Sequence, residues 1–215
     1  MNSLNRTTAM PVTSANQGIH TILSDDKLFD EAQTQHLHEL RVVRFSAIGN
    51  THLLGTKKLG LLCSNKCPGK LILQTHDLLA SLHGQHITVV GGFHSPIEKE
   101  CLNILLRGDC PTIICPARSL DRMRIPRGWK TPLDRGRMLL LSAFSSSNRR
   151  PTRQSTVRRN CIVAALADKV FIPYAAPGSK TETLAKRLVS LRQEVLTIPD
   201  DHNSNLLDLV VRAWC

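Results

Sequence analysis

Short apolar runs alternate with amphipathic stretches along most of the chain. Six runs have the length of a strand and are almost continuously apolar, which is typical of strands covered on both faces. They occupy Leu59–Cys63, Ile87–Val90, Thr112–Cys115, Met138–Ser142, Val170–Tyr174 and Val195–Ile198. Between them, apolar residues recur with helical spacing in segments 71–82, 97–105, 160–168 and 181–191. This alternation predicts an α/β fold, an open, doubly wound, mostly parallel, Rossmann-like sheet with helices on both faces.

The ends of this pattern divide the chain into three parts. Residues 1–22 are rich in Thr, Ser and Asn, which predicts a disordered tail. Ser24 is the expected N-cap of an amphipathic helix over residues 25–40, so residues 23–57 form a short helical lead-in. Residues 58–215 then make up the Rossmann-like domain.

Two connections within that domain are long for a compact fold. Residues 117–137 and 145–156 contain Pro, Ser and Arg without an apolar period. Long connections of this kind are usually functional loops or disordered segments. We predict that both are loops.

The composition favours a protein that stays in the cytoplasm. No run of 18 apolar residues occurs, and the first 18 residues lack the apolar region of a secretory signal. The seven cysteines are odd in number and include no Cys-x-x-Cys pair, so free thiols are expected. We therefore expect a cytoplasmic location and no membrane partner.

Positive charge is concentrated in one fifth of the chain. The 28 basic and 17 acidic residues give a net charge of +11. Segment 118–159 holds twelve of the basic residues, opposed by Asp121 and Asp134, and so carries ten of the eleven net charges. Eleven of the twelve are arginines, whose guanidinium groups pair well with phosphate. A solvated basic surface is the alternative, but the clustering favours a polyanionic partner.

Three turns that follow predicted strands could approach an anion. The residues of interest are Ser64 and Lys66 in the first turn, Gly91 and Gly92 in the second, and Gly178, Ser179 and Lys180 in the third. In doubly wound sheets, ligands bind where helix N-termini meet the carboxyl ends of the strands. Capping boxes are predicted at Ser95 with Glu98 and at Ser179 with Glu182. A helix start alone explains the capping residues, whereas the glycines favour a ligand-facing turn.

Other chemistries have little support in the sequence. There is no Walker A loop, no Gly-x-Ser-x-Gly elbow and no Gly-x-Gly-x-x-Gly dinucleotide motif. Cys63 and Cys67 lack a second pair at zinc spacing. We predict no catalytic residue, no metal site and no cofactor. Aromatic residues make up 4% of the chain, so base stacking would be sparse.

The order of several motifs resembles the DprA/Smf family of DNA-processing proteins. The matching segments are Ile48-Gly49-Asn50 with Leu53-Leu54, Cys63-Ser64-Asn65, Gly91-Gly92-Phe93, Arg159-Asn160 followed by Ile162 and Ala165-Leu166, and Pro199 with Asn205-Leu206-Leu207. The resemblance implies a Rossmann-like domain that binds single-stranded DNA, a RecA-type recombinase as partner, and a homodimer. Asn65 and Cys161 stand where the family has arginines, and we expect Lys66 to substitute for the first.

Two functions follow from these observations. The first is binding of single-stranded DNA without sequence preference, in DNA processing or recombination. Its groove would consist of Ser64, Lys66, Gly91, Gly92, Arg118, Arg149, Arg150, Arg153, Arg158, Arg159, Asn160, Gly178, Ser179 and Lys180. The alternative is a small-nucleotide enzyme or sensor, because residues 177–182 are similar in part to the phosphate loop of LOG phosphoribohydrolases. The charge distribution favours DNA.

Overall fold

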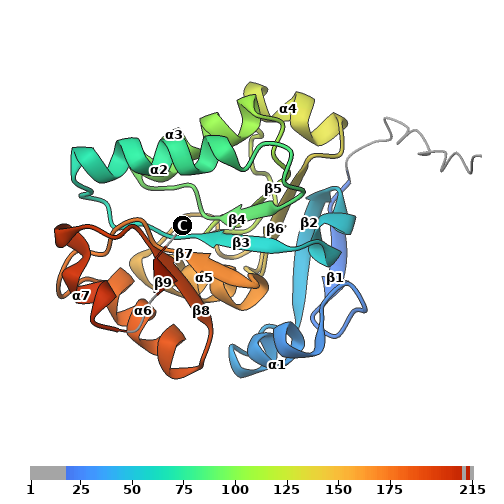
Figure 1. The fold of residues 1–215 in the computed structure, drawn as a ribbon. Coiled ribbons are helices and arrows are strands. Elements are labelled where there is room, and N and C mark those ends of the chain that lie inside the picture. Colours follow the sequence, from blue (N-terminus) through green and yellow to red (C-terminus); the bar gives the residue numbers. More distant parts are fainter. Residues whose placement is uncertain (1–17, 210–211, 214–215) are drawn as a thin grey trace, which may run out of the picture.

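A nine-stranded sheet forms the centre of the described part of the chain (Figure 1). The computed structural model describes residues 18–209 and 212–213. The strands are β1 (His20–Leu23), β2 (Arg44–Gly49), β3 (Lys58–Leu61), β4 (Thr88–Gly91), β5 (Thr112–Ile114), β6 (Met138–Ser142), β7 (Lys169–Phe171), β8 (Glu194–Thr197) and β9 (Arg212–Ala213). Their order across the sheet is β1-β2-β6-β5-β4-β3-β7-β8-β9.

Most of the sheet is parallel, as the sequence predicts. The seven strands from β6 to β9 in the sheet order pair in parallel, whereas β2 is antiparallel to both β6 and β1. Each of the six apolar runs overlaps a strand, β3 to β8, with ends that differ by up to three residues. The strands that the pattern did not predict, β1, β2 and β9, lie at or next to the two edges of the sheet.

Helices cover both faces of the sheet, which confirms the doubly wound architecture. They are α1 (Glu31–Glu39), α2 (Gly69–Ser81), α3 (Pro96–Arg107), α4 (Arg127–Asp134), α5 (Arg153–Leu166), α6 (Lys180–Ser190) and α7 (Ser204–Leu207), with short 3-10 turns at Thr51–Gly55 and Asp201–Asn203. In Figure 1, α2, α3 and α4 lie above the sheet, and α1, α5 and α6 lie below it. No helix in the described residues is long and apolar enough to cross a membrane.

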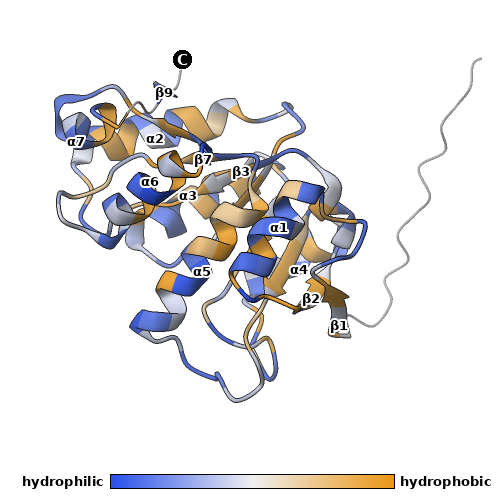
Figure 2. Ribbon diagram, turned by 90° about the horizontal axis from the view of Figure 1, so that it is seen from below, coloured by the Kyte–Doolittle hydropathy of each residue, from blue (hydrophilic) through white to orange (hydrophobic). Residues whose placement is uncertain are grey.

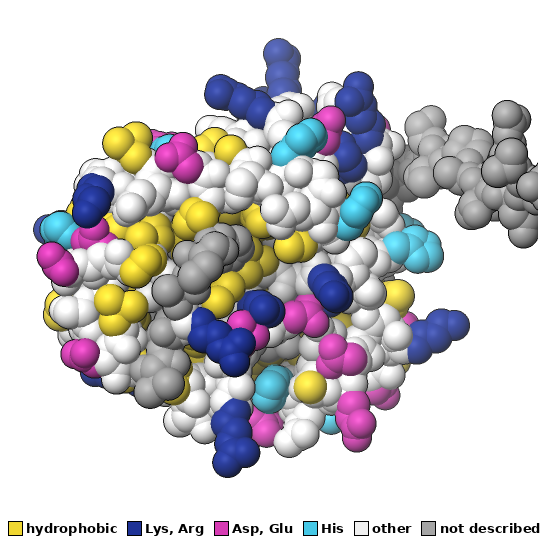
Figure 3. Space-filling model, in the orientation of Figure 1, with side chains coloured by type: hydrophobic (Ala, Val, Ile, Leu, Met, Phe, Trp, Pro, Cys, Tyr) yellow, Lys and Arg dark blue, Asp and Glu magenta, His cyan; other side chains and the backbone are white. Residues whose placement is uncertain are grey.

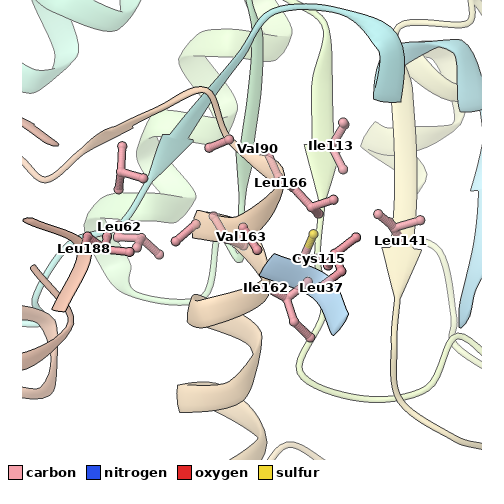
Figure 4. Packing of buried hydrophobic residues seen from close by; sticks show 14 of the residues in the cluster. Leu37, Leu62, Val90, Ile113, Cys115, Leu141, Ile162, Val163, Leu166 and Leu188 are labelled. Carbon is pink, nitrogen blue, oxygen red and sulfur yellow. The ribbon is translucent and has the colours of Figure 1, made fainter. Parts of the chain in front are cut away.

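Two apolar layers hold these helices against the sheet. The lower layer centres on α5, whose Val163 and Leu166 lie on the side of Val90 and Ile113 of the strands, while Ile162 lies beside Leu37 of α1 (Figure 4). The upper layer joins residues of α2, α3 and α4 to the opposite side of the same strands. Figure 2 shows that α5 changes along its length, from a hydrophilic first turn to an apolar second half. Its first turns are therefore available for function while its end anchors the core.

Several boundaries differ from the sequence-based expectation. The lead-in helix begins at Glu31 rather than at residue 25, because Asp30 instead of Ser24 accepts the capping hydrogen bond, from the N–H of Gln33. The sheet begins at His20, so β1 and β2 join the domain that was expected to start at residue 58. The remainder of the expected tail, residues 1–17, lies outside the described residues.

The two predicted loops are also partly helical. Segment 117–137 contains α4, and segment 145–156 ends in the first turn of α5. Thr152 caps α5 by accepting the N–H of Ser155, and the Ser155 hydroxyl accepts the N–H of Thr152. Arg153 therefore lies on the first turn of a helix rather than in a loop.

Candidate nucleic-acid interface

The turns after β3 and β7 meet at the point where the direction of chain winding changes. Strand β3 lies between β4 and β7, and the chain winds outward from it in both directions. This is the position at which open α/β sheets bind ligands. Ser64, which is 7% exposed, joins the two turns because its hydroxyl accepts the N–H of Ala176 and lies 3.3 Å from the Ser179 hydroxyl.

A cleft of about 660 Å³ opens over this junction. Its volume falls in the range of roughly 300–1,000 Å³ that is common for ligand sites. The predicted site residues that line it are Ser64, Lys66, Arg153, Arg159, Asn160, Ser179 and Lys180. Residues that the sequence analysis did not select, including Glu98, Thr152, Thr156 and Thr181, line it too. We call it the first cleft. Exposed cations come from three separate elements around it, Lys66, Arg153 and Lys180.

Arg159 forms the inner wall of the first cleft. The residue is 3% exposed, and its guanidinium donates to the carbonyl of Cys115 at 3.2 Å and to Oδ1 of Asn160 at 2.7 Å. Gly92 leaves the space that this group needs, since a Cβ there would lie 1.2 Å from Nη1 of Arg159. Gly92 thus admits an arginine of the same chain, and it also lines a cleft on the other side of Arg159, so its predicted contact with a ligand stays a prediction.

A second cleft of about 480 Å³ begins on the other side of Arg159. Arg159, His94 and Pro151 line both clefts, so the two adjoin at these residues. The second cleft has a largely apolar wall that includes Phe93, Ile114, Pro116, Met123 and Trp129, and Arg118 and Lys99 also line it. Phe93 adopts a φ of 47°, in the left-handed region, at the start of this turn.

The two arginine-rich connections are joined to each other beside the second cleft. The N–H of Ser119 donates to the carbonyl of Asn148, and the hydroxyl of Ser142 donates to the carbonyl of Arg118. Arg149 and Arg150 follow directly and are exposed, although they line neither cleft. Figure 3 shows Lys and Arg side chains projecting over the region of α3 and α4.

Two carboxylates take up backbone N–H groups of the turns. Glu98, which is 4% exposed, accepts the N–H of Cys63 through Oε1 and those of His94 and Ser95 through Oε2. It thereby completes the predicted capping box with Ser95. Glu182 accepts the N–H of Gly178 rather than that of Ser179, so the second predicted box is present in one direction only.

Some predicted site residues lie away from both clefts. Gly91 is a buried residue of β4, where a Cβ would lie 3.1 Å from the Phe93 ring. Gly178 supplies a φ of +72° and its N–H to Glu182. Arg158 is exposed on α5 and donates to the carbonyl of Arg41 on the lower face. Helical geometry explains the contrast between Arg158 and Arg159, because neighbouring residues on a helix point in different directions.

The cysteine side chains of the described residues are present as thiols. Those among the described residues are free, and these residues contain no group of three or more potential metal ligands. A hydrogen bond between the Cys63 and Cys67 thiols raises the pKa of Cys63 and lowers that of Cys67. Burial raises the pKa of Cys115 to about 12, so this thiol stays protonated.

The chain matches one protein family over most of its length. A sequence model of the family described as DNA recombination-mediator protein A aligns with residues 20–208. The chain belongs to this family. The match begins at β1, and so it includes β1 and β2, which the apolar pattern alone did not predict, but ends before β9. Comparison with curated proteins finds no match.

Solved structures of the family share this fold. DNA processing protein A from Streptococcus pneumoniae aligns at a TM-score of 0.75 and 19% identity, covering 92% of this chain and 71% of that chain. The Helicobacter pylori protein, described as binding single-stranded DNA, aligns at 0.69 and 20% identity, covering 91% and 90%. A molybdenum cofactor binding protein from Rippkaea orientalis aligns at 0.52 and 11% identity, covering 74% and 90%. Such identities indicate a shared fold.

Proposed function

We propose that this recombination-mediator family member binds single-stranded DNA without sequence preference and without catalysis. The strand would cross the carboxyl ends of β3 and β7 in the first cleft and continue past Arg159 into the second. The observation that carries the proposal is the convergence of Lys66, Arg153 and Lys180, from three separate elements, on one cleft. Binding of single-stranded DNA by the Helicobacter pylori relative supports the same ligand.

Charge at the rim of the clefts suits the backbone of the nucleic acid. Lys66, Arg153 and Lys180 are exposed, and among the described residues their side chains have no hydrogen-bond or ion-pair partner that would limit them to a structural role. Proteins that bind single strands track the phosphates with such cations. Arg118 and the neighbouring Arg149 and Arg150 extend the positive surface beyond the second cleft.

The apolar wall of the second cleft suits a base. Trp129 is partly exposed there, with Met123 and Pro116 beside it. Stacking of a base on an aromatic ring contributes about 1–3 kcal/mol and tolerates any sequence. A base in the second cleft and phosphates in the first would use both parts of the groove.

The test is a titration of fluorescein-labelled oligonucleotides, single- and double-stranded and of two sequences, at two salt concentrations. We expect tight binding of both single strands at low salt and a steep loss with salt. Each phosphate contact contributes about 0.7 to the slope of log affinity against log salt. Lys66→Ala, Arg153→Ala and Lys180→Ala should each reduce that slope by about this amount.

Arg158→Ala is the matched control, because Arg158 is an exposed arginine on the same helix as Arg153 but lies outside both clefts. Its affinity and slope should equal those of the unaltered protein. Equal losses for Arg153→Ala and Arg158→Ala would refute the groove, and no binding at low salt would refute DNA as the ligand.

The nucleotide-hydrolase alternative has weaker support. In a phosphate loop the glycine N–H faces the ligand, whereas here the N–H of Gly178 is bound by the carboxylate of Glu182. Hydrogen bonds from Asn205 and Gly178 lower the pKa of Glu182, so it stays anionic at neutral pH. Release of adenine from AMP, measured by chromatography, would reverse this preference.

A RecA-type recombinase and a second copy of the chain are the partners that this function calls for. Light scattering coupled to gel filtration, with and without an oligonucleotide, tests the homodimer. Strand exchange by a RecA-type protein in the presence of this chain tests the mediator role. A monomer at all concentrations, or no effect on exchange, would limit the function to DNA binding.

A further inference from the structure

The carboxylate of Glu98 occupies the position at the strand ends where an anionic ligand would be expected. Its two oxygens accept the N–H of Cys63 at the end of β3, at 3.2 Å, and the N–H groups of His94 and Ser95 after β4, at 2.9 and 3.3 Å. These donors surround the N-terminus of α3, which carries partial positive charge. Backbone donors of this kind bind phosphate when they are free.

Glu98 also offsets the charge of the arginine behind the first cleft. Burial lowers the pKa of Arg159, and the negative charge of Glu98 acts in the opposite direction. Glu98 is 4% and Arg159 3% exposed. Two buried opposite charges leave the inner wall of the first cleft close to neutral. A free phosphate that entered there would meet a buried carboxylate and would lose its own hydration.

The accessible positive charge therefore lies at the rim. Lys66, Arg153 and Lys180 line the first cleft and are exposed. An exposed cation binds one phosphate weakly in water, because solvent and salt screen the pair. Several phosphates joined in one strand can contact several such cations at once, and each further contact then forms at a high effective concentration.

From this arrangement we propose that Glu98 is a specificity-determining residue. Its carboxylate keeps inorganic phosphate and mononucleotides out of the turns after β3 and β4, and leaves the groove to a polymer that reaches the cations at the rim. The part of the proposal that concerns binding of a polymer in the groove rests on the proposed function. The part that concerns exclusion of small anions can be tested without DNA.

The experiment compares the binding of inorganic phosphate and of AMP to the unaltered protein and to Glu98→Ala. Calorimetric titration and the shift of the melting temperature are the two readouts. Removing the carboxylate leaves three backbone donors facing a small space, and an anion should take its place. We expect phosphate to bind Glu98→Ala at least about tenfold more tightly than the unaltered protein, as when a buried like charge is removed. Phosphate should also raise the melting temperature of the variant alone.

Glu100→Ala is the matched control, since Glu100 is an exposed carboxylate on the same helix that pairs with His76. It should respond to phosphate like the unaltered protein. Glu98→Gln is the second variant: it keeps the size of the side chain and removes the charge, and it should gain less phosphate affinity than Glu98→Ala because its amide oxygen can still accept a backbone N–H.

The outcomes separate this inference from the proposed function. If the unaltered protein binds phosphate or AMP as tightly as Glu98→Ala or Glu98→Gln does, or as tightly as it binds an oligonucleotide, Glu98 excludes nothing and the inference is wrong. The comparison of phosphate and AMP with an oligonucleotide uses the unaltered protein alone, so it can be made even if Glu98→Ala does not fold. Failure of the unaltered protein to bind an oligonucleotide, with phosphate affinity still gained by the variants, would refute the proposed function and leave the exclusion intact.

Discussion

Substitutions of Gly92 and Arg159 should have non-additive effects on the free energy of unfolding. In Gly92→Ala the new Cβ would lie 1.2 Å from Nη1 and 1.8 Å from Cζ of Arg159, so the guanidinium must leave its site. Gly92 does not have a positive φ, and the backbone can therefore accept alanine. The cost of the substitution comes from the displaced arginine and not from backbone strain.

The size of that cost follows from the bonds that Arg159 makes. When the guanidinium moves toward solvent, the carbonyl of Cys115 loses its 3.2 Å hydrogen bond to a charged donor inside the protein. Such a bond contributes about 1.5–3 kcal/mol. Replacing glycine where the backbone allows it offsets roughly 0.4–1 kcal/mol through the unfolded chain. The net destabilisation should be about 0.5–2.6 kcal/mol, or roughly 1–10 °C in melting temperature.

A double-mutant cycle measured by urea denaturation isolates this contact. Gly92→Ala, Arg159→Ala and the double variant are compared with the unaltered protein. Without the guanidinium, alanine at position 92 meets no obstruction, so Gly92→Ala in the Arg159→Ala background should stabilise the protein by roughly 0.4–1 kcal/mol. The coupling free energy should be about 1.5–3 kcal/mol, because the offset from the unfolded chain is the same in both backgrounds and cancels. An equal cost for Gly92→Ala in both backgrounds would show that Arg159 does not occupy this space.

Three further outcomes are expected. Thr152→Ala removes the cap of α5 and should cost about 1 kcal/mol in urea denaturation; no loss of stability would mean that another group caps the helix. Hydrogen bonds from Lys70 and His202 hold the pKa of Asp200 well below its usual range. The contribution of Asp200 to the stability of the folded protein is therefore complete above about pH 4 and is lost as the pH falls. Asp200→Asn should therefore lose less stability than the unaltered protein between about pH 4 and pH 2, and parallel curves would contradict this. Iodoacetamide at pH 8 should alkylate Cys67 before Cys115, as mass spectrometry of peptides will show, and early labelling of Cys115 would contradict its burial.

The sequence by itself determined the architecture. Buried parallel strands need apolar residues on both faces, so β3 to β8 appear as continuous runs and could be predicted from the pattern. Strands β1 and β2 do not, because exposed and half-buried positions interrupt their buried ones. The first turn of α5 is polar because it faces the first cleft, and its lack of an apolar period hid the start of the helix.

The sequence also identified the three turns and the excess of arginine, but not which residues meet. Lys66, Arg153 and Lys180 are far apart along the chain and reach one cleft because β3 and β7 are neighbours in the sheet. Arg158 and Arg159 are adjacent in sequence, yet one is exposed on the lower face and the other is buried beside Gly92. Tertiary structure decided these roles. The direction of a side chain and the hydrogen-bond donors around it depend on how distant segments pack together, and a local sequence pattern does not contain that information.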